Sequence, residues 1–356
     1  MKTRSIRDVD FAHKKVLLRA DTDVPLLRGH LEGQDHPGGA FNVTVADDFR
    51  LSRMRPTFDL LLSQMAKIVV LGHLDRPGGR VVEEERLTPV VAWFSSRYPN
   101  KVKDARTLIG MDARQAVLAL NDGEILFLEN LRFDSGEEAN RESLARELAT
   151  YGQAFVNECF AASHRGHASI AGLPKLLPSY GGLNLESEVE NLSQALTHSR
   201  RPLLVVIGGE KIETKIPVID KFLAVADKIL VTGKVGVEIA QLPHYHSQKL
   251  IYSTGDPDIF PDELERFASL IAIAGTIIWN GPAGDVSRGH LDGTRKLAEL
   301  IAATNAKTIV GGGDTNEVLR KFNLRDKFSF ISTGGGSMLE FLTGKELPGL
   351  KPLLIA

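Results

Sequence analysis

The sequence contains little cysteine, no long apolar run and no excess of positive charge, and each of these absences excludes a class of protein. Cys159 is the only cysteine in 356 residues, so an internal disulfide framework is excluded and a reducing compartment is favoured. No apolar run approaches the roughly 20 residues of a membrane-spanning helix. Met1–Asp8 lacks the apolar segment of a signal peptide. We therefore expect a cytoplasmic protein with no membrane partner.

Charge and motif content exclude further classes. The formal net charge is −2, so no overall basic surface indicates a nucleic acid partner. The Gly-x-x-x-x-Gly-Lys-Ser/Thr loop of P-loop proteins is missing, and so is the His-Arg-Asp and Asp-Phe-Gly pair of protein kinases. A length of 356 residues favours two domains, and the composition, 43% hydrophobic and 25% charged, is that of a globular protein.

The sequence does contain two glycine-rich segments, each directly after an apolar run of β type. The first, Thr308–Thr315, has three glycines before Asp314, and the spacing of Asn316–Phe322 predicts a helix. A strand, a glycine loop and a helix N-terminus together bind phosphate through bare backbone N–H groups. A tight turn that simply needs glycine would give the same residues. The second segment, Ile331–Glu340, repeats the pattern one strand later and favours the phosphate interpretation.

Apolar runs alternate with helical patterns in both halves of the chain, which predicts an α/β fold. Strands are predicted at Lys14–Arg19, Lys67–Leu71, Ile125–Leu128, Ala154–Asn157, Pro202–Ile207, Lys228–Val231, Leu250–Tyr252, Thr276–Trp279, Thr308–Val310 and Ser329–Ile331. Helices are predicted at Asp47–Ala66, Ser143–Thr150, Leu183–Ser199 and Ile216–Val225, with Pro217 in the first turn of the last helix. Arg28–Ala46, rich in glycine, histidine and polar residues, is predicted to be a long surface loop.

This pattern predicts two doubly wound, Rossmann-like domains with parallel sheets, joined by a hinge helix. We place the N-terminal domain at residues 1–176, the linker and hinge helix at 177–199, and the C-terminal domain at 200–344.

In the first half, charged side chains follow the predicted strands. They are Asp21, Asp23, His73, Arg76, Arg132, His164 and Arg165, joined by Arg50 at a helix start. Each arginine or histidine alone is more often a solvated charge than a ligand. Because parallel strands end at one edge of a sheet, the set together predicts a cationic pocket for a small, multiply anionic substrate.

In the second half, Lys211 and Lys215 follow a strand and the pair Gly208-Gly209. Two lysines at helical spacing are usually a solvated stripe, but this position favours contact with phosphate. Two anion pockets in two domains joined by a hinge suggest phosphoryl transfer across a closing cleft, because closure would exclude water as a competing acceptor.

These residues resemble the phosphoglycerate kinase family along most of the chain. The matching stretches in the first half are Leu18–Pro25, His73–Pro77, Leu128–Phe133, Phe155–Phe160, Ala162–Ser169 and Leu177–Tyr180. In the second half they are Gly208–Lys211 with Lys215, Ile278–Pro282, Gly311–Thr315, Ser332–Gly336 and Gly344–Gly349.

The resemblance implies a glycolytic enzyme, a monomer, that transfers phosphate reversibly between ATP and the carboxylate of 3-phosphoglycerate, giving ADP and 1,3-bisphosphoglycerate. It implies that phosphoglycerate is held by Asp21, Asp23, Arg50, His73, Arg76, Arg132, His164 and Arg165. It implies that the nucleotide is held by Gly208, Gly209, Lys211, Lys215, Asn280, Gly281, Pro282, Gly311, Gly312, Gly313, Asp314, Thr315, Gly334, Gly335 and Gly336. Arg50 and Lys215 would flank the transferring group as catalytic residues, Asp314 would carry Mg²⁺ with ATP or ADP, and residues 345–356 would pack back on the N-terminal domain.

The chain also departs from the family pattern. Asp23 stands where the family has asparagine, Asp75 replaces a glycine, and Ala161-Ala162 replaces Gly-Thr. The glycine-rich nucleotide segment is reduced to Val231–Val235, and residues 232–278 form a shorter region than in the family. Ser287 falls where the family has a ribose-binding glutamate, with Asp285 as a substitute two residues earlier. These changes affect the contacts of the base and the ribose more than those of the phosphates.

Three functions are consistent with these observations. The first is an active phosphoglycerate kinase with a trimmed nucleotide domain. The second is a related kinase that uses another phosphoryl donor or another acyl phosphate. The third is a catalytically silent protein that binds a phosphorylated metabolite. A degenerate protein should lose its clustered catalytic charges first, and Arg50, Lys211, Lys215 and Asp314 are all present, so we expect the enzyme.

Overall fold

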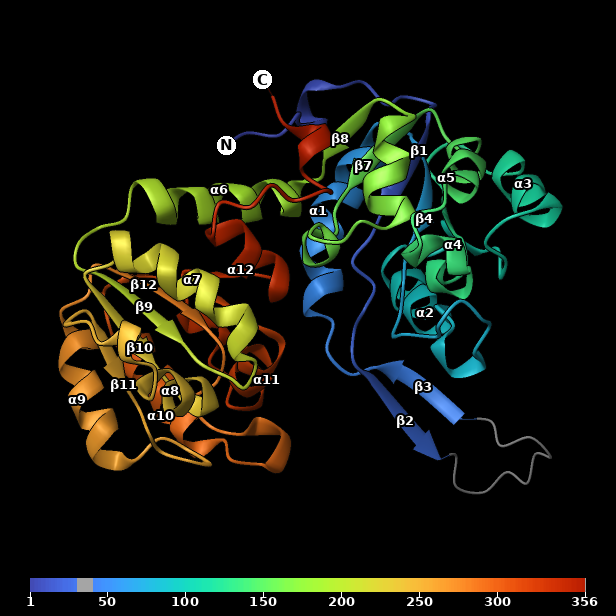
Figure 1. Cartoon of the computed structure of the whole chain (residues 1–356). Coiled ribbons are helices and arrows are strands. Elements are labelled where there is room, and N and C mark those ends of the chain that lie inside the picture. The colour runs from blue at the N-terminus through green and yellow to red at the C-terminus, as the bar shows by residue number, and fades with distance from the viewer. Residues whose placement is uncertain (31–40, 356) are drawn as a thin grey trace. The chain divides into compact units, whose positions relative to one another are not determined.

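The computed structural model describes residues 1–30 and 41–355 and divides the chain into two compact units. Unit 1 comprises Met1–Ser187 with Leu347–Ala356, and unit 2 comprises Glu188–Glu346 (Figure 1). Each unit is built on a six-stranded parallel sheet, which confirms the predicted α/β class with two parallel sheets. Among the described residues, no helix is long and apolar enough to cross a membrane.

The sheet of unit 1 is covered by helices on both faces. Its strand order is β5 (Val102–Asp104), β6 (Ile125–Phe127), β4 (Lys67–Leu71), β1 (Lys15–Arg19), β7 (Ala154–Asn157) and β8 (Ser179–Gly181). Val16 and Leu18 of β1 lie in one core with Phe58 of α1 (Phe49–Ser63) and Phe94 of α2 (Thr88–Arg97). Leu17 lies in the other core with residues of α3 (Met111–Leu118) and α5 (Glu142–Ala149). Side chains of a strand alternate between faces, so a strand apolar throughout must be covered twice.

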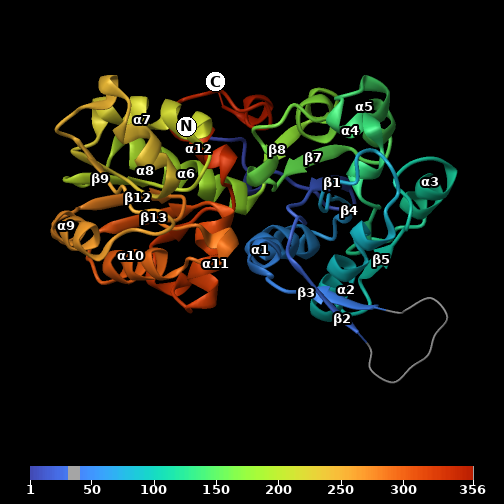
Figure 2. The ribbon, with the colours of Figure 1, turned by 60° about the horizontal axis from the view of Figure 1, so that its bottom comes forward.

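Unit 2 repeats this design. Its strand order is β11 (Leu250–Tyr252), β10 (Lys228–Val231), β9 (Leu203–Ile207), β12 (Thr276–Asn280), β13 (Lys307–Gly311) and β14 (Phe330–Ile331). Figure 2 shows this sheet between two helical layers. One layer holds α7 (Ile212–Val225), α8 (Gly233–Ala240) and α12 (Gly336–Leu342), and the other holds α9 (Pro261–Ala272), α10 (Asp292–Ala302) and α11 (Gly313–Lys321).

Each sheet has one point at which the order of its strands reverses. In unit 1 the chain passes from β1 to β4 on one side and later adds β7 on the other side of β1. In unit 2, β10 and β12 flank β9 in the same way. Doubly wound folds bind their ligands beyond the carboxyl ends of the strands at such a point. The loops after β1, β4 and β7, and those after β9 and β12, are therefore the positions at which to look for a site.

The helix α6 (Leu183–Thr197) runs from unit 1 into unit 2. The carboxylate of Glu158 accepts hydrogen bonds from the backbone N–H groups of Asn184, at 3.1 Å, and Leu185, at 3.0 Å. Burial raises the pKa of Glu158 to about 8, and its carboxyl oxygens cap the helix by accepting from these otherwise unpaired donors. The chain returns to unit 1 at its end, where the N–H of Arg4 donates to the carbonyl of Leu353 at 2.7 Å.

Two predicted features are wrong. Residues 28–46 are not wholly a loop, because β2 (Leu26–His30) and β3 (Phe41–Val45) form an antiparallel pair in which Leu26 faces Val45. These two apolar side chains pack against the core of unit 1, which fixes the register of the pair; residues 31–40 lie outside the described part of the chain. The helix α7 begins at Ile212 rather than Ile216, so Pro217 lies inside the helix and not in its first turn.

Candidate active site

At the switch point of unit 1, an arginine is held by two aspartates. Arg50 Nη1 donates to Asp21 Oδ1 at 3.3 Å and to the backbone carbonyl of Asp23 at 2.9 Å. The negative charge of Asp21 is the main reason that the pKa of Arg50 is raised. Burial raises the pKa of Asp21, and Arg50 opposes that shift. Asp21 is fully buried whereas the side chain of Arg50 is 27% exposed, so Arg50 is the member of the pair that can reach a ligand.

The predicted aspartate at position 23 ties two loops together. Its Oδ1 accepts a hydrogen bond from the backbone N–H of Asp75 at 3.0 Å. Asp75 has a φ of +53°, a conformation in which glycine is the easiest residue. Asp23 Oδ2 lies 4.0 Å from Arg50 Nη1 and 3.9 Å from His73 Nε2. Asp23 and Asp75, which both depart from the family pattern, are therefore joined by this hydrogen bond.

His73 was expected to act as a cation, and this expectation is wrong. Its side chain is buried after β4, and burial lowers its pKa well below the ordinary value, with further lowering by the charges of Arg19 and Arg132. An imidazole in this setting is neutral at pH 7. It can still hold an anionic ligand as a hydrogen-bond donor, but it does not add a positive charge to the site.

The remaining predicted residues of unit 1 lie on three loops. Arg132 is buried, its Nε lies 3.3 Å from Glu138 Oε1, and its Nη1 donates to the carbonyl of Asp75. Burial is the main cause of the lowered pKa of Arg132, and the charge of Arg165 contributes to it. His164 and Arg165 are partly exposed on the loop after β7. Arg76 is exposed and makes no hydrogen bond or ion pair within the described part of the chain, so the structure does not tie it to the others.

In unit 2, the glycine loops that follow the strands lie against one another. A Cβ at Gly208 would lie 2.1 Å from the carbonyl oxygen of Pro282, and a Cβ at Gly281 would lie 2.1 Å from that of Gly208. Gly281 also has a φ of +99°, so glycine is required there on both grounds. A Cβ at Gly335 would lie 3.5 Å from Gly312 Cα, which places the loops after β13 and β14 side by side. The predicted glycine sites thus form one continuous strip of backbone.

A buried lysine lies beside this strip. Lys215 Nζ donates to Asn280 Oδ1 at 2.6 Å, and the lysine side chain is almost completely buried in α7. Burial lowers the pKa of Lys215 to about 8, and the carboxylate of Asp314 opposes this shift. Asp314 is exposed in the first turn of α11, and Lys211 is exposed at the N-cap of α7. The arrangement provides one shielded and one accessible positive charge for phosphate oxygens.

A pocket of about 200 Å³ lies at the same edge of the sheet of unit 2. It is lined by Gly209, Glu210, Gly233, Lys234, Gly255, Asp256, Pro257, Gly284, Asp285 and Arg288. None of the lining side chains is aromatic or large and aliphatic, although such side chains normally enclose a nucleotide base. Asp285 Oδ1 accepts a hydrogen bond from Ser287 Oγ at 2.6 Å, so the residues at the predicted ribose position are bonded to each other.

Asp258, for which the sequence predicts no role, holds one wall of this pocket in place. Asp258 Oδ2 accepts from the N–H of Gly293 at 2.9 Å, at the start of α10. The N–H of Asp285 donates to the carbonyl of Pro257, also at 2.9 Å. The short loop after β11 is thereby fixed against the loop after β12.

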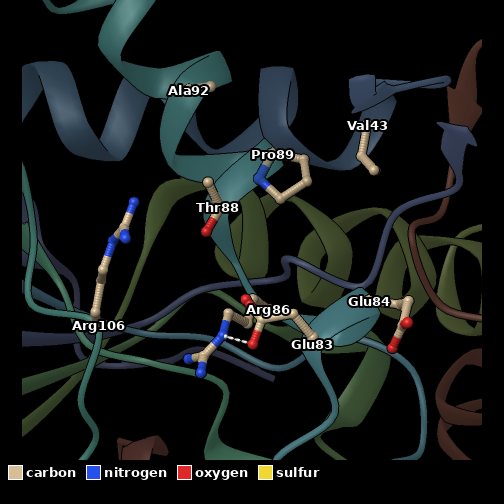
Figure 3. Close-up of a pocket in the computed structure, with 8 residues that line it drawn as sticks. All are labelled: Val43, Glu83, Glu84, Arg86, Thr88, Pro89, Ala92 and Arg106. Carbon is tan, nitrogen blue, oxygen red and sulfur yellow. Dashed lines mark hydrogen bonds and ion pairs between the residues drawn. The ribbon is translucent and has the colours of Figure 1, made fainter. Parts of the chain in front are cut away.

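A pocket of about 460 Å³ in unit 1 is separate from the predicted residues (Figure 3). It lies between Val43 of β3 and Pro89 and Ala92 of α2, with Glu83 and Arg86 below them in the view. Arg86 donates to Glu83 and to Glu129, each at 2.7 Å. Because its central arginine is already bonded to two carboxylates, this pocket does not form a free anion site.

Sequence reasoning also missed four buried polar residues of unit 1 beneath the site: Arg19, Glu137, His167 and Ser169. Arg19 ends a predicted buried strand, and a charged residue at that position is the available signal. His167 and Ser169 lie in the stretch Ala162–Ser169, for which no role of theirs is predicted, and Glu137 gives no signal.

The fold is that of an α/β protein with two doubly wound parallel sheets, each with charged side chains or glycine loops after its central strands. A family model for phosphoglycerate kinase matches residues 6–256 and 244–345. The chain is 34% identical to the phosphoglycerate kinase of Roseiflexus sp. (strain RS-1), with 99% of both proteins covered, and 33% identical to that of Pelotomaculum thermopropionicum, with 99% of this chain and 100% of the relative covered. The chain therefore belongs to the phosphoglycerate kinase family, and is a kinase.

A solved structure supports this assignment. The phosphoglycerate kinase of Coxiella burnetii matches with a TM-score of 0.79 and 30% identity, covering 98% of each chain. The alignment with the Roseiflexus protein has 406 positions, which exceeds the 356 residues of this chain, so that relative has segments that this chain lacks.

Proposed function

We propose that the protein catalyses the reversible transfer of the γ-phosphoryl group of ATP to the carboxylate of 3-phosphoglycerate. The observation that supports this proposal is that each sheet has a basic side chain near its switch point, Arg50 in unit 1 and Lys215 in unit 2. In the forward direction a carboxylate oxygen of the acceptor forms a bond to the γ-phosphorus, the bond to the β–γ bridging oxygen breaks, and ADP leaves. No covalent enzyme intermediate is needed, because positioned charges can stabilise the phosphoryl transition state.

Unit 1 corresponds broadly to the predicted N-terminal domain of residues 1–176. It is proposed to bind phosphoglycerate. Arg132, Arg165 and His164 would bind its anionic groups, with Arg76 joining them. His73 would donate a neutral hydrogen bond, and Asp21 would orient Arg50 rather than touch the substrate. Arg50 would meet the transferring group. This division follows from burial, since Asp21 is inaccessible and Arg50 is not.

Unit 2 is proposed to bind the nucleotide along the glycine strip and at Lys211, Lys215 and Asn280. The residues fit a Mg²⁺ ion bound with the nucleotide phosphates, because Asp314 offers an exposed carboxylate and the hydroxyl of Thr315 beside it is buried without a partner among the described residues. When bound, the ion would neutralise phosphate charge. Asp314 would hold it, while Lys215 would donate to a phosphoryl oxygen.

A coupled assay with the purified protein tests the proposal directly. Turnover should require ATP, 3-phosphoglycerate and Mg²⁺ together. Absence of turnover with tight binding of 3-phosphoglycerate would indicate a silent metabolite-binding protein instead. Turnover only with another phosphoryl donor would indicate the related-kinase alternative. A monomer in the cytoplasm is part of the same proposal, and light scattering of the purified protein checks the first point.

Replacing Asp23 by asparagine is expected to tighten binding of 3-phosphoglycerate by about three- to tenfold. Asparagine can keep the hydrogen bond from the N–H of Asp75, and the substitution removes a negative charge that repels the substrate. Isothermal titration of the two proteins measures the difference. Weaker binding in the variant would show instead that the charge of Asp23 is needed to organise Arg50, whose Nη1 lies 4.0 Å away.

ATP and GTP are expected to differ by no more than about tenfold in kcat/KM, which corresponds to about 1.4 kcal/mol. The phosphate-binding residues cannot distinguish nucleotides, and the adjoining pocket has no aromatic or large aliphatic wall. Base discrimination depends on polar groups that the wrong base would leave unpaired. Initial rates with ATP, GTP and CTP at saturating 3-phosphoglycerate provide the test. A preference for ATP of several hundredfold would show that the pocket rebuilds an adenine site.

A further inference from the structure

Beneath His73 lies a cluster of fully buried polar residues from three separate elements. Arg19 ends β1, Glu137 lies in α4 (Ser135–Glu138), and Ser169 lies in η5 (Ala168–Gly172). Arg19 Nη2 is 2.9 Å from His73 Nδ1, and Arg19 Nε donates to Ser169 Oγ at 2.9 Å. Ser169 donates from both its hydroxyl, at 2.5 Å, and its backbone N–H, at 2.9 Å, to Glu137. The cluster therefore joins a buried carboxylate to the imidazole through two intervening side chains.

Every hydrogen bond in this cluster has only one possible direction. The Ser169 hydroxyl has a single proton, which it donates to Glu137 Oε1 at 2.5 Å. The same hydroxyl oxygen is then free to accept from Arg19, and a guanidinium only donates. Nδ1 of His73 must accordingly accept, and a neutral imidazole that accepts at Nδ1 carries its proton at Nε2.

Burial and the neighbouring charges keep the His73 ring neutral. Burial is the main cause of its lowered pKa, and the positive charges of Arg19, Arg132 and Arg50 act in the same sense. Within residues 1–30 and 41–355, Asp23 is the carboxylate that faces the ring, with Oδ2 3.9 Å from Nε2. That separation is too long for a direct hydrogen bond, so the Nε2 proton is not consumed by Asp23. Glu137 Oε1 lies 4.0 Å from Arg19 Nη2, so the Glu137 carboxylate balances the charge of the buried guanidinium. The same oxygen lies 3.8 Å from His167 Nδ1.

We propose that Glu137, Ser169 and Arg19 form a one-way hydrogen-bond chain that locks His73 in its Nε2–H tautomer and so presents a fixed neutral donor to the acceptor substrate. Arg19, Ser169 and Glu137 are positioning residues that act through His73. The proposal rests on the proposed function for the identity of the substrate, but the tautomer itself does not depend on it.

A fixed neutral donor has a consequence for binding. Because His73 adds no charge, its contribution does not change as the solution passes through the pH range in which free histidine titrates. If the lock were lost and both tautomers became equally populated, only half of the molecules would offer the donor, and the KM for 3-phosphoglycerate would rise about twofold. Loss of the ordered donor altogether would raise KM about tenfold.

Long-range ¹H–¹⁵N correlation spectra of the full chain, labelled at histidine nitrogen, test the lock. Comparison with the His73→Gln variant assigns the His73 ring. We expect an unprotonated Nδ1 and a protonated Nε2 from pH 5.5 to 8. In the Arg19→Gln variant we expect the Nδ1–H tautomer to appear and His73 to titrate closer to the ordinary histidine pKa of about 6.5. A wild-type ring protonated at Nδ1 would overturn the proposal.

The variants are chosen to separate the lock from general stability. Arg19→Gln leaves Glu137 without its counter-charge, so the double variant Arg19→Gln/Glu137→Gln, which removes both buried charges, provides a second test with the same expected change in tautomer. Glu158→Gln alters another fully buried acidic side chain of unit 1 that contacts Thr57 and α6 instead, and should leave the His73 signals unchanged. An unchanged tautomer in both Arg19 variants would overturn the proposal.

The steady-state KM for 3-phosphoglycerate should rise two- to tenfold in these variants. If the wild-type protein shows no such turnover, the proposed function fails while the spectra still decide the lock.

Discussion

Replacing Lys215 by alanine is expected to lower kcat by about 10²- to 10³-fold while changing the KM for 3-phosphoglycerate little. Lys215 Nζ is held by Asn280 at 2.6 Å in a buried position, so its charge is already oriented before a phosphoryl group arrives. A preorganised charge in a desolvated position acts most strongly where negative charge develops, in the transition state. An interaction of that kind appears in kcat rather than in KM.

Steady-state kinetics of three variants measure this effect against matched controls. Lys221 lies on the same helix and is exposed, so Lys221→Ala should be close to wild type. Lys211 is also exposed, and Lys211→Ala should mainly raise the KM for the nucleotide. If Lys215→Ala keeps a near-normal kcat with a raised nucleotide KM, Lys215 is a binding residue and its catalytic assignment is wrong.

The burial of Lys215 also predicts a pH dependence with a definite sign. Burial lowers its pKa to about 8, so the free enzyme loses this charge as the pH rises through 8, and kcat/KM for the nucleotide should fall there. Bound phosphates favour the charged form, so the fall in kcat should come at higher pH. The contribution of this group to stability has the opposite sign. Between about pH 8 and its unfolded value of about 10.5 the unfolded chain binds the extra proton, so the contribution of Lys215 to stability rises with pH and does not itself promote alkaline unfolding.

The sequence was sufficient to predict those parts of the fold that depend on buried apolar runs. β4, β7 and β10 have the predicted bounds, because a strand covered on both faces is mostly apolar and is easy to distinguish from its polar flanks. The edge strand β11 also has the predicted bounds, although it is only partly buried. The pair β2 and β3 was missed because its polar and glycine residues resemble a loop, while its register depends on Leu26 and Val45 reaching a core formed by distant residues.

The candidate site could be predicted as a set of residues but not as a set of charges. Apolar runs predict the strands and so also the segments that follow them: His73 follows β4, Arg132 follows β6, and Lys215 lies in α7, the helix after β9. Burial decides whether such a group is charged, and burial arises from packing that a linear sequence does not display. His73 is neutral because it is covered and because Arg19 lies beside it, and Glu137 joins the cluster from a helix that was not predicted.

Replacing Arg50 by alanine is expected to reduce kcat by about 10²-fold or more and also to destabilise unit 1. The kinetic effect follows from its accessible guanidinium, which is held at the switch point by Asp21 and the carbonyl of Asp23. The loss of stability follows because Asp21 would remain fully buried without its ion-pair partner. We expect roughly 2 kcal/mol, below the 3–5 kcal/mol of fully buried pairs, since the side chain of Arg50 is 27% exposed.

A second substitution separates the two effects. In Arg50→Ala/Asp21→Asn the unpaired carboxylate is replaced by a neutral amide of similar shape, so most of the lost stability should return because no buried charge remains unpaired. The lost kcat should not return, because the charge that meets the transferring group is still missing. Urea unfolding and steady-state rates of the single and double variants, with Arg55→Ala as an exposed control on the same helix, provide the measurements. Recovery of kcat together with stability in the double variant would mean that Arg50 only holds Asp21 in place, and that the phosphoryl group is met by another residue.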